Sequence, residues 1–212
     1  MKILSVRPLA VPDVLTVRFA RFSDDRGFFT EPYRAGDFDA APGLEALRGL
    51  RFVQVNESFS KKGVVRGLHF QWDPPQGKLV RTLRGRMIDL AVDVRQGSPT
   101  LGKVVAHDMA RREGDAEGEW IWLPPGFAHG VIFLEDTTIE YLCTAPWNPA
   151  GEGGVTPLTD GLDWSLCDPA AARAAREALS GGPVLSDKDR AAPPLAGWLS
   201  DPRSAAFRHG KR

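Results

Sequence analysis

Histidines are the side chains best suited to move protons near neutral pH, and this sequence has four of them. His69 stands in RGLHFQ, a strand-like run behind an Arg-Gly pair, and His129 stands in the rigid turn LPPGFAHG. The local sequence leaves three roles open for His69, namely a structural residue, a metal ligand or a base. For His129 it is equally consistent with a hydrogen-bonding core residue and with a functional residue. His107 is expected on a strand surface and His209 in a solvated tail.

A metal site at His69 finds little support in the spacing. A β-barrel metal site typically has two histidines one residue apart, followed by a carboxylate and a distant histidine. Here Gln71 occupies the position of the second histidine. Three or four convergent ligands are needed for such a site. The sequence therefore predicts no metal, with a metal-dependent protein using His69, His129 and a carboxylate as a remaining alternative.

Acid–base chemistry at His69 requires a carboxylate to orient the ring and a proton donor across the pocket. Only two tyrosines exist, and Tyr141 in TIEYLCT is placed by strand alternation to face a barrel interior, although it is equally an ordinary strand aromatic. Arginine suits a phosphate group and lysine suits a developing oxyanion. Polar and cationic side chains near His69 in the sequence are Gln54, Asn56, Arg66 and Lys78.

The elements that must position these residues are mostly short strands. Residues 51–145 alternate between strand-like runs and Gly or Pro punctuation at intervals of roughly 8–12 residues, which is typical of a β-sandwich or barrel. Within this block, residues 78–95 are expected to form two strands folded about Gly85. Short helices are predicted within 35–50 and, more strongly, within 168–182, where an Asp-Pro pair can start the helix.

These patterns predict one domain over residues 1–212. It comprises an N-terminal extension (about 1–50), a core of strands (51–145), and a C-terminal helical portion with a polar tail that either wraps the surface or is loose (146–212). With 42% hydrophobic residues, a chain of 212 residues can bury one core.

Charge and cysteine content exclude several functions. Lys and Arg together number 27, as do Asp and Glu, so no basic field points to nucleic acid. Only Cys143 and Cys167 are present, without metal-type spacing, which favours a reducing, cytoplasmic compartment. The N-terminal segment is broken by Pro8 and Pro12 and lacks a signal-peptide core, and no run of about 18 apolar residues exists to span a membrane. A soluble protein is expected.

Several strings of the sequence together resemble one family. QVNESFSKKGVVRGLHFQ is followed by QGKLVRTLRGRMIDLAVDVRQGSPTLGK and LPPGFAHGV, with RGFFTEPYR before them and LSDKD after them. In this order they resemble the dTDP-4-dehydrorhamnose 3,5-epimerase family. The resemblance implies a jelly-roll fold of the cupin type, a homodimer, and no metal or organic cofactor. It also implies epimerisation at C3 and C5 of a nucleotide-linked 4-keto-6-deoxyhexose, with dTDP-4-keto-6-deoxyglucose as the expected substrate on the path to dTDP-L-rhamnose.

The resemblance also implies a role for each matching residue. His69 is the base, Asp189 of LSDKD is its carboxylate partner, Tyr141 is the acid on the opposite face, and Lys78 stabilises the enolate oxygen. The N-terminal segment of one subunit is expected to complete the neighbour's site. The residues implied in substrate binding are Arg26, Phe29, Glu31, Gln54, Asn56, Arg66 and His129.

Some segments depart from the family pattern. Pro146 and Trp147 occupy an aromatic segment that follows the acid tyrosine, so Trp147 is expected to replace an aromatic that stacks on the base or shapes the sugar pocket. The segment 166–183 is longer than usual. Three alternatives stay open: a mono-epimerase acting only at C3 or C5, a non-catalytic sugar-nucleotide binder, and a metal-dependent protein of the same fold.

Overall fold

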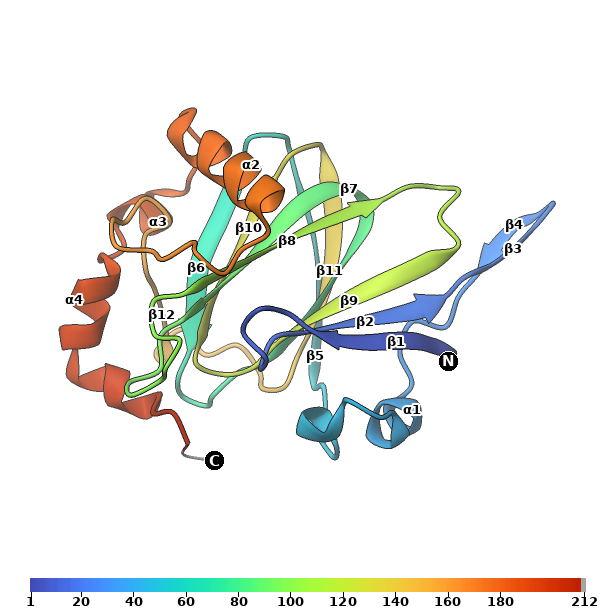
Figure 1. Cartoon of the computed structure of the whole chain (residues 1–212), viewed down its shortest axis with the longest axis horizontal. Helices are drawn as coiled ribbons and strands as arrows, with labels where there is room; N and C mark the ends of the chain where they lie inside the picture. The colour runs from blue at the N-terminus through green and yellow to red at the C-terminus, as the bar shows by residue number, and fades with distance from the viewer. Residues whose placement is uncertain (211–212) are drawn as a thin grey trace.

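The computed structural model describes residues 1–210, so the last two residues of the predicted tail lie outside the described residues. The fold is a jelly-roll β-sandwich of the cupin type with short helices towards both ends of the chain, as predicted (Figure 1). In chain order its elements are β1 (Ile3–Pro8), β2 (Leu15–Ala20), β3 (Phe22–Asp24), β4 (Gly27–Phe29), α1 (Ala35–Ala40), η1 (Glu45–Leu47), β5 (Gln54–Ser60), β6 (Val65–Gln71), β7 (Lys78–Asp93), β8 (Val104–Arg111), β9 (Glu117–Leu123), β10 (Phe127–Phe133), β11 (Thr137–Cys143), β12 (Glu152–Gly154), α2 (Pro169–Ser180), α3 (Asp187–Ala191), α4 (Leu195–Ser200) and η2 (Pro202–Ala206).

Two antiparallel layers share the long strand β7. One layer runs β1-β2-β9-β7-β11-β5, and it uses the first half of β7. The other runs β12-β6-β10-β7-β8 and uses the second half. Apolar side chains from both layers meet between them in a cluster that includes Val80, Met87, Ile121 and Val131. Any polar side chain that points inwards from either layer also lies in this space, beside the apolar cluster.

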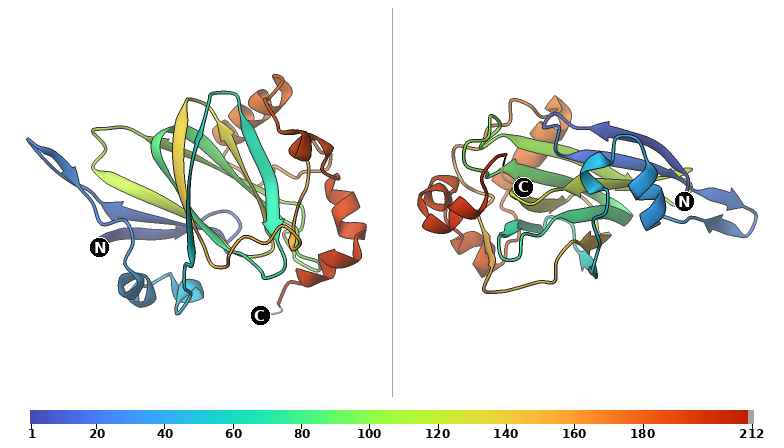
Figure 2. Two further views of the ribbon diagram at one scale, coloured as in Figure 1. Left: turned by 180° about the vertical axis from the view of Figure 1, so that it is seen from behind. Right: turned by 90° about the horizontal axis from the view of Figure 1, so that it is seen from below.

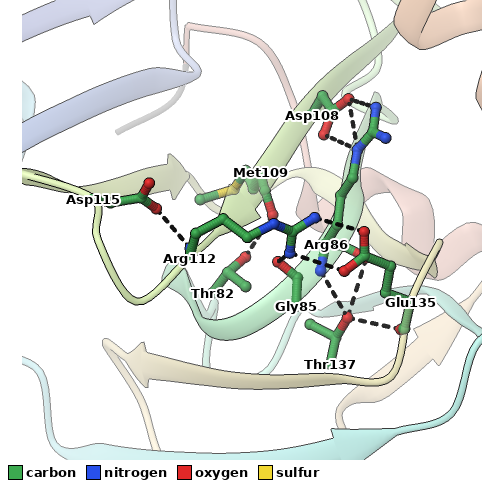
Figure 3. Close-up of polar contacts among 9 residues, drawn as sticks. All are labelled: Thr82, Gly85, Arg86, Asp108, Met109, Arg112, Asp115, Glu135 and Thr137. Atoms are coloured by element: carbon green, nitrogen blue, oxygen red, sulfur yellow. Dashed lines mark hydrogen bonds and ion pairs between the residues drawn. The ribbon is translucent and has the colours of Figure 1, made fainter.

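The bend that lets β7 serve both layers lies at Gly85. The prediction of two strands folded about Gly85 is wrong, because β7 is one 16-residue strand that bends there. Gly85 has a φ of +96°, and a Cβ at this position would lie 2.5 Å from the carbonyl oxygen of Asp136. Glycine is needed at such a close approach. Figure 3 shows the contacts that stabilise the bend. Arg112 donates to the Gly85 carbonyl at 3.2 Å and is paired with the Glu135 carboxylate.

Part of the predicted N-terminal extension belongs to the β-sandwich. β1 and β2 pair with each other, and β2 pairs with β9, so the layer begins at Ile3 rather than near residue 50. The helices expected within 35–50 are present as α1 and η1. Between β2 and α1, the β3–β4 hairpin projects from the body on the side opposite α4 (Figures 1 and 2).

The C-terminal portion covers one face of the sandwich. α2 begins where predicted, with the Asp168 carboxylate accepting the amides of Ala170 and Ala171. Of the two expectations for the stretch after Arg190, the surface-wrapping tail fits and the loose tail does not, since α4 and the residue that follows η2 pack onto the core through the buried Trp198 and Phe207. Two isolated aromatic residues in a polar, Pro-containing stretch make no periodic pattern, which is why the sequence did not indicate this packing.

No helix within residues 1–210 is both long enough and apolar enough to cross a membrane.

Candidate active site

A pocket of about 510 Å³ lies between the two layers. One layer contributes side chains from β6 and β10, and the other contributes side chains from β5, β11 and the start of β7. The segment 184–189, which leads into α3, closes one side. The residues brought together include four predicted as catalytic and two predicted to bind substrate, namely His69, Lys78, Tyr141, Asp189, Arg66 and His129.

His69 and Asp189 form a close pair at this pocket. The Nε2 atom of His69 lies 2.5 Å from Oδ1 of Asp189, although 120 residues separate them in the chain. Asp189 is buried on α3, where Ser186 caps the helix by accepting the Asp189 amide, and its other oxygen accepts the Gly67 amide at 3.3 Å. Burial raises the pKa of Asp189, but the His69 hydrogen bond and charge, the Gly67 amide and the Ser186 hydroxyl lower it more.

This arrangement fixes which ring nitrogen of His69 acts as a base. An ionised Asp189 accepts the Nε2 proton, so the lone pair of the neutral ring is on Nδ1. The carboxylate also stabilises the imidazolium that forms when Nδ1 takes up a proton. The pair therefore has the parts of a general base.

A second histidine–carboxylate pair lies beside the first. His129 is opposite His69 in the β10–β6 register, and its Nε2 atom lies 2.8 Å from Oδ2 of Asp89. Asp89 is fully buried on β7, and its other oxygen has no hydrogen-bond partner within the described chain. The sequence analysis did not identify Asp89. The one signal available was a carboxylate inside the otherwise apolar run MIDLAV.

Tyr141 and Lys78 face the histidines from the opposite layer. Both are half-buried, and both lie on strands of the layer that contains β5, β11 and the start of β7. Burial raises the pKa of the Tyr141 phenol, so the hydroxyl keeps its proton. Burial lowers the pKa of the Lys78 ammonium against the opposing effects of Cys143, Glu152 and Asp89.

Other predicted residues lie at or beside the rim. The Arg66 guanidinium lines the pocket and donates to the Ser60 hydroxyl at 2.9 Å. Gln54 and Asn56 are hydrogen-bonded to each other at 3.0 Å on β5, and Gln54 accepts the backbone amide of Trp147 at 2.8 Å. Trp147 is exposed. These three residues lie side by side without lining the pocket itself.

Three predicted binding residues are not brought to this pocket within one chain. Arg26 and Phe29 lie on the projecting hairpin, where the Arg26 side chain is 90% exposed and pairs with Asp24, and Phe29 is 69% exposed. Glu31 pairs with Arg34 and with the N-terminal amine. Among residues 1–210, no residue of this hairpin lines the pocket of its own chain.

Two further side chains at the pocket escaped the sequence analysis. Lys188, next to Asp189, lines the pocket and forms an ion pair with Glu152 on β12. Glu152 also accepts the indole N–H of Trp147. Burial raises the pKa of Glu152, and the hydrogen bonds from Lys188 and Trp147 lower it below its usual range. Lys188 lies within LSDKD, but that motif does not indicate its contact with Glu152, because the contact depends on the distant segments 147–152 and 184–189.

The donor set offers little to a metal ion. Within residues 1–210, no group of three or more His, Cys, Asp and Glu side chains is placed to hold one. His69 and His129 each direct Nε2 at a carboxylate instead.

A jelly-roll barrel that holds a histidine–carboxylate pair opposite a protonated tyrosine and a lysine has the parts to remove a proton from one face of a carbon and return one to the other. Such a site is that of a carbohydrate epimerase, and comparison with known proteins gives the family.

A model of the family dTDP-4-dehydrorhamnose 3,5-epimerase matches residues 8–197. The chain is 40% identical over 186 residues to the dTDP-4-dehydrorhamnose 3,5-epimerase of Pseudomonas aeruginosa, covering 86% of this chain and 91% of that protein. The chain therefore belongs to the dTDP-4-dehydrorhamnose 3,5-epimerase family, and it is an isomerase.

Solved structures agree with this assignment. A dTDP-6-deoxy-D-glucose-3,5-epimerase from Legionella pneumophila Philadelphia 1, in complex with dTDP-4-keto-L-rhamnose, has a TM-score of 0.78 at 32% identity, covering 98% of this chain and 99% of that one. A 4-keto-6-deoxy sugar epimerase from the novobiocin biosynthetic gene cluster of Streptomyces spheroides has a TM-score of 0.76 at 33% identity, covering 93% and 90%.

Proposed function

We propose that this chain inverts C3 and C5 of a dTDP-4-keto-6-deoxyhexose without a cofactor, with dTDP-4-keto-6-deoxyglucose as substrate. The observation that carries the proposal is the His69–Asp189 pair, which shares one pocket with Tyr141 and Lys78. A relative of the same family has been solved with dTDP-4-keto-L-rhamnose bound, which supports this substrate class. The whole chain acts as one epimerase domain.

The chemistry follows from the C4 ketone. Protons on the carbons next to a ketone are acidic, because their removal leaves an enolate. His69 takes such a proton on Nδ1, and the electron pair of the broken C–H bond moves into the enolate, whose oxygen is stabilised by the Lys78 ammonium. Tyr141 then protonates the same carbon from the opposite face, which inverts it. Proton exchange with water resets His69 and Tyr141.

The rim residues fit the remainder of a nucleotide sugar. The Arg66 guanidinium is suited to the diphosphate, since arginine binds phosphate oxygens bidentately. Gln54, Asn56 and the exposed Trp147 form a polar and aromatic surface beside it, for hydrogen bonding to and stacking on the base. His129 contacts the sugar from the neighbouring strand of the pocket.

We further propose a homodimer in which the hairpin of one subunit completes the partner's site. The outer face of β5 exposes Val55 and Phe59, and Val53 just before the strand is exposed as well. Within residues 1–210, β5 pairs only with β11 and so has a free edge for a second copy. Arg26 and Phe29 on the projecting hairpin would then reach a pocket other than their own.

Mixing two inactive variants tests this arrangement. His69→Asn subunits keep a normal hairpin, and Arg26→Ala/Phe29→Ala subunits keep a normal pocket. When the two are co-expressed with different tags, random pairing should restore about a quarter of the wild-type activity per site, since half the dimers are mixed and each has one complete site. Each variant expressed alone is the control. No recovery in isolated mixed dimers would show that the hairpin serves its own pocket.

The proposed function is tested by NMR in deuterated buffer with dTDP-4-keto-6-deoxyglucose. We expect deuterium at both C3 and C5 and the appearance of the inverted sugar. Exchange at one carbon only would identify a mono-epimerase, and no exchange at either would leave only a binding function. The same assay after treatment with a strong chelator should give unchanged rates, whereas loss of activity restored by a metal would favour the metal-dependent alternative.

Lys78 sets an alkaline limit on activity. Because burial lowers the pKa of Lys78, its ammonium loses its proton at a pH below the ordinary lysine range, while the raised pKa of Tyr141 keeps the phenol protonated there. The charged form is present below that pKa and lost above it, so kcat/KM should fall as the pH rises through it. Lys78→Arg retains a cation at every pH tested. A pH–rate profile of this variant should lack the fall, and an unchanged fall would assign it to another group.

We also propose a cytoplasmic location, because Cys143 and Cys167 are free thiols of the kind that a reducing compartment maintains.

A further inference from the structure

A row of polar side chains crosses the apolar interior of the barrel beside His129, and the steps described above do not use it. Asp89 lies on β7, His107 on β8 and Glu119 on β9. Side chains alternate between the two faces of a strand, and each of these three is on the face that points between the layers. Five of the six residues two positions away from them belong to a buried apolar cluster, namely Met87, Ala91, Val105, Met109 and Ile121. His107 was expected on a strand surface, and this expectation is wrong.

The contacts in the row run from the pocket towards the outside. His129 Nε2 lies 2.8 Å from one oxygen of Asp89. His107 is directly opposite Asp89 in the β7–β8 register, a position that places two Cβ atoms about 4.5–5.5 Å apart. Its Nε2 atom lies 2.9 Å from the carboxylate of Glu119, which also meets Arg18 near the surface at 3.6 Å.

The second oxygen of Asp89 makes the row unusual. It is buried and has no hydrogen-bond partner among the residues that the structure describes. A buried carboxylate needs a compensating charge. Burial lowers the pKa of His107, but the Glu119 hydrogen bond and the charges of Glu119, Asp89 and Asp108 raise it more, so the imidazolium is favoured. His107 thus supplies positive charge close to Asp89 from the neighbouring strand.

We propose that His107 is a positioning residue that acts on His129 through Asp89. Its imidazolium, held by Glu119, neutralises part of the Asp89 charge and so keeps Asp89 from holding His129 in the protonated form. A neutral His129 donates Nε2–H to Asp89 and leaves Nδ1 free to accept a hydrogen bond from a sugar hydroxyl. This last step rests on the proposed function, whereas the coupling between the two rings does not.

Six further cationic or titratable groups line the pocket with His129, and none belongs to the row, namely Arg66, His69, Lys78, Tyr141, Lys188 and Asp189. His69 faces it from β6 and Lys78 from the start of β7, while the Tyr141 hydroxyl faces it from β11. They are unchanged in the variants below. Any shift in the His129 titration on changing His107 therefore reports on the row.

The test is a histidine NMR titration of the full-length protein without substrate. The chain has four histidines, so the ring signals can be assigned from single His→Gln variants. In His107→Gln, the His129 titration midpoint should move upwards by about one pH unit, the size expected when a nearby charge is removed. In His107→Lys, which keeps a cation between Asp89 and Glu119, the midpoint should stay closer to that of the wild type. Glu140→Gln, which breaks the Arg81 ion pair on the outer face, is the matched control and should leave it unchanged.

An unchanged His129 midpoint in folded His107→Gln overturns the proposal, and so does an equal shift in His107→Lys, which would indicate packing rather than charge. If His107→Gln does not fold, Glu119→Gln replaces it. That variant should lower the midpoint of His107 itself and raise that of His129, and the absence of both shifts is also contrary to the proposal. Because no substrate is present, these outcomes are independent of the deuterium-exchange assay.

Discussion

His69→Asn should lower kcat/KM by a factor of at least about 10³ and remove deuterium exchange at both C3 and C5, because it removes the base while preserving the shape of the side chain. Substrate binding should be affected far less, because the contacts proposed for Arg66 with the diphosphate and for Trp147 with the nucleobase do not involve this ring. Deuterium incorporation and calorimetric binding of dTDP to the same preparation separate these two effects.

The matched control is His209→Asn, which changes an exposed histidine outside the pocket and should leave both measurements unchanged. The kcat/KM of Asp189→Asn should lie between those of His69→Asn and His209→Asn, because the imidazole remains but loses the charge that stabilises its protonated form. Exchange at wild-type rates in His69→Asn would assign the base to another residue, with His129 as the first candidate.

Tyr141→Phe should separate proton removal from inversion. The variant keeps the base and the enolate stabiliser, so deuterium should still enter the substrate, returned to the same face by His69. Inversion should fall by a factor of about 10² or more, because no acid is left on the opposite face. The measurement is the ratio of deuterated starting sugar to inverted product, followed by NMR over time.

A second outcome would contradict this division of roles. If Tyr141→Phe loses exchange and inversion in equal proportion, the phenol contributes to proton removal itself, for example by binding the enolate oxygen in place of Lys78. Tyr33→Phe is the control, because Tyr33 packs against Phe38 and Phe52 in a separate cluster and should change neither rate.

Local patterns predicted the fold where a residue's own neighbours decide its structure. α2 has its capping Asp168 and its proline within the first turn, and the strand series has turn residues between its members. Gly85 shows the limit of such reasoning. A glycine between two strand-like runs is equally compatible with a hairpin and a bend, and the choice depends on Asp136 and Arg112, which come from elsewhere in the chain.

The candidate site was predicted largely from the family resemblance, since spacing alone left His69 with three possible roles. The structure adds the contacts that long-range folding creates. Asp189 reaches His69 across 120 residues, and no property of either segment alone indicates that distance. For the same reason Asp89 was overlooked and His107 was expected on a strand surface, because a carboxylate and a histidine on separate apolar strands come together only when the strands are in register.

The shared strand β7 makes the two layers a single cooperative unit. Lys78 lies at its first residue and Asp89 beyond its bend, so the strand carries a pocket lysine in one layer and the carboxylate that holds His129 in the other. Neither layer can open without breaking the hydrogen bonds that β7 makes to its neighbours, and these amides should be among the slowest to exchange. Asp189, by contrast, lies on a five-residue helix outside the layers. The pocket therefore takes its polar groups both from the strand that the two layers share and from a short helix held outside them.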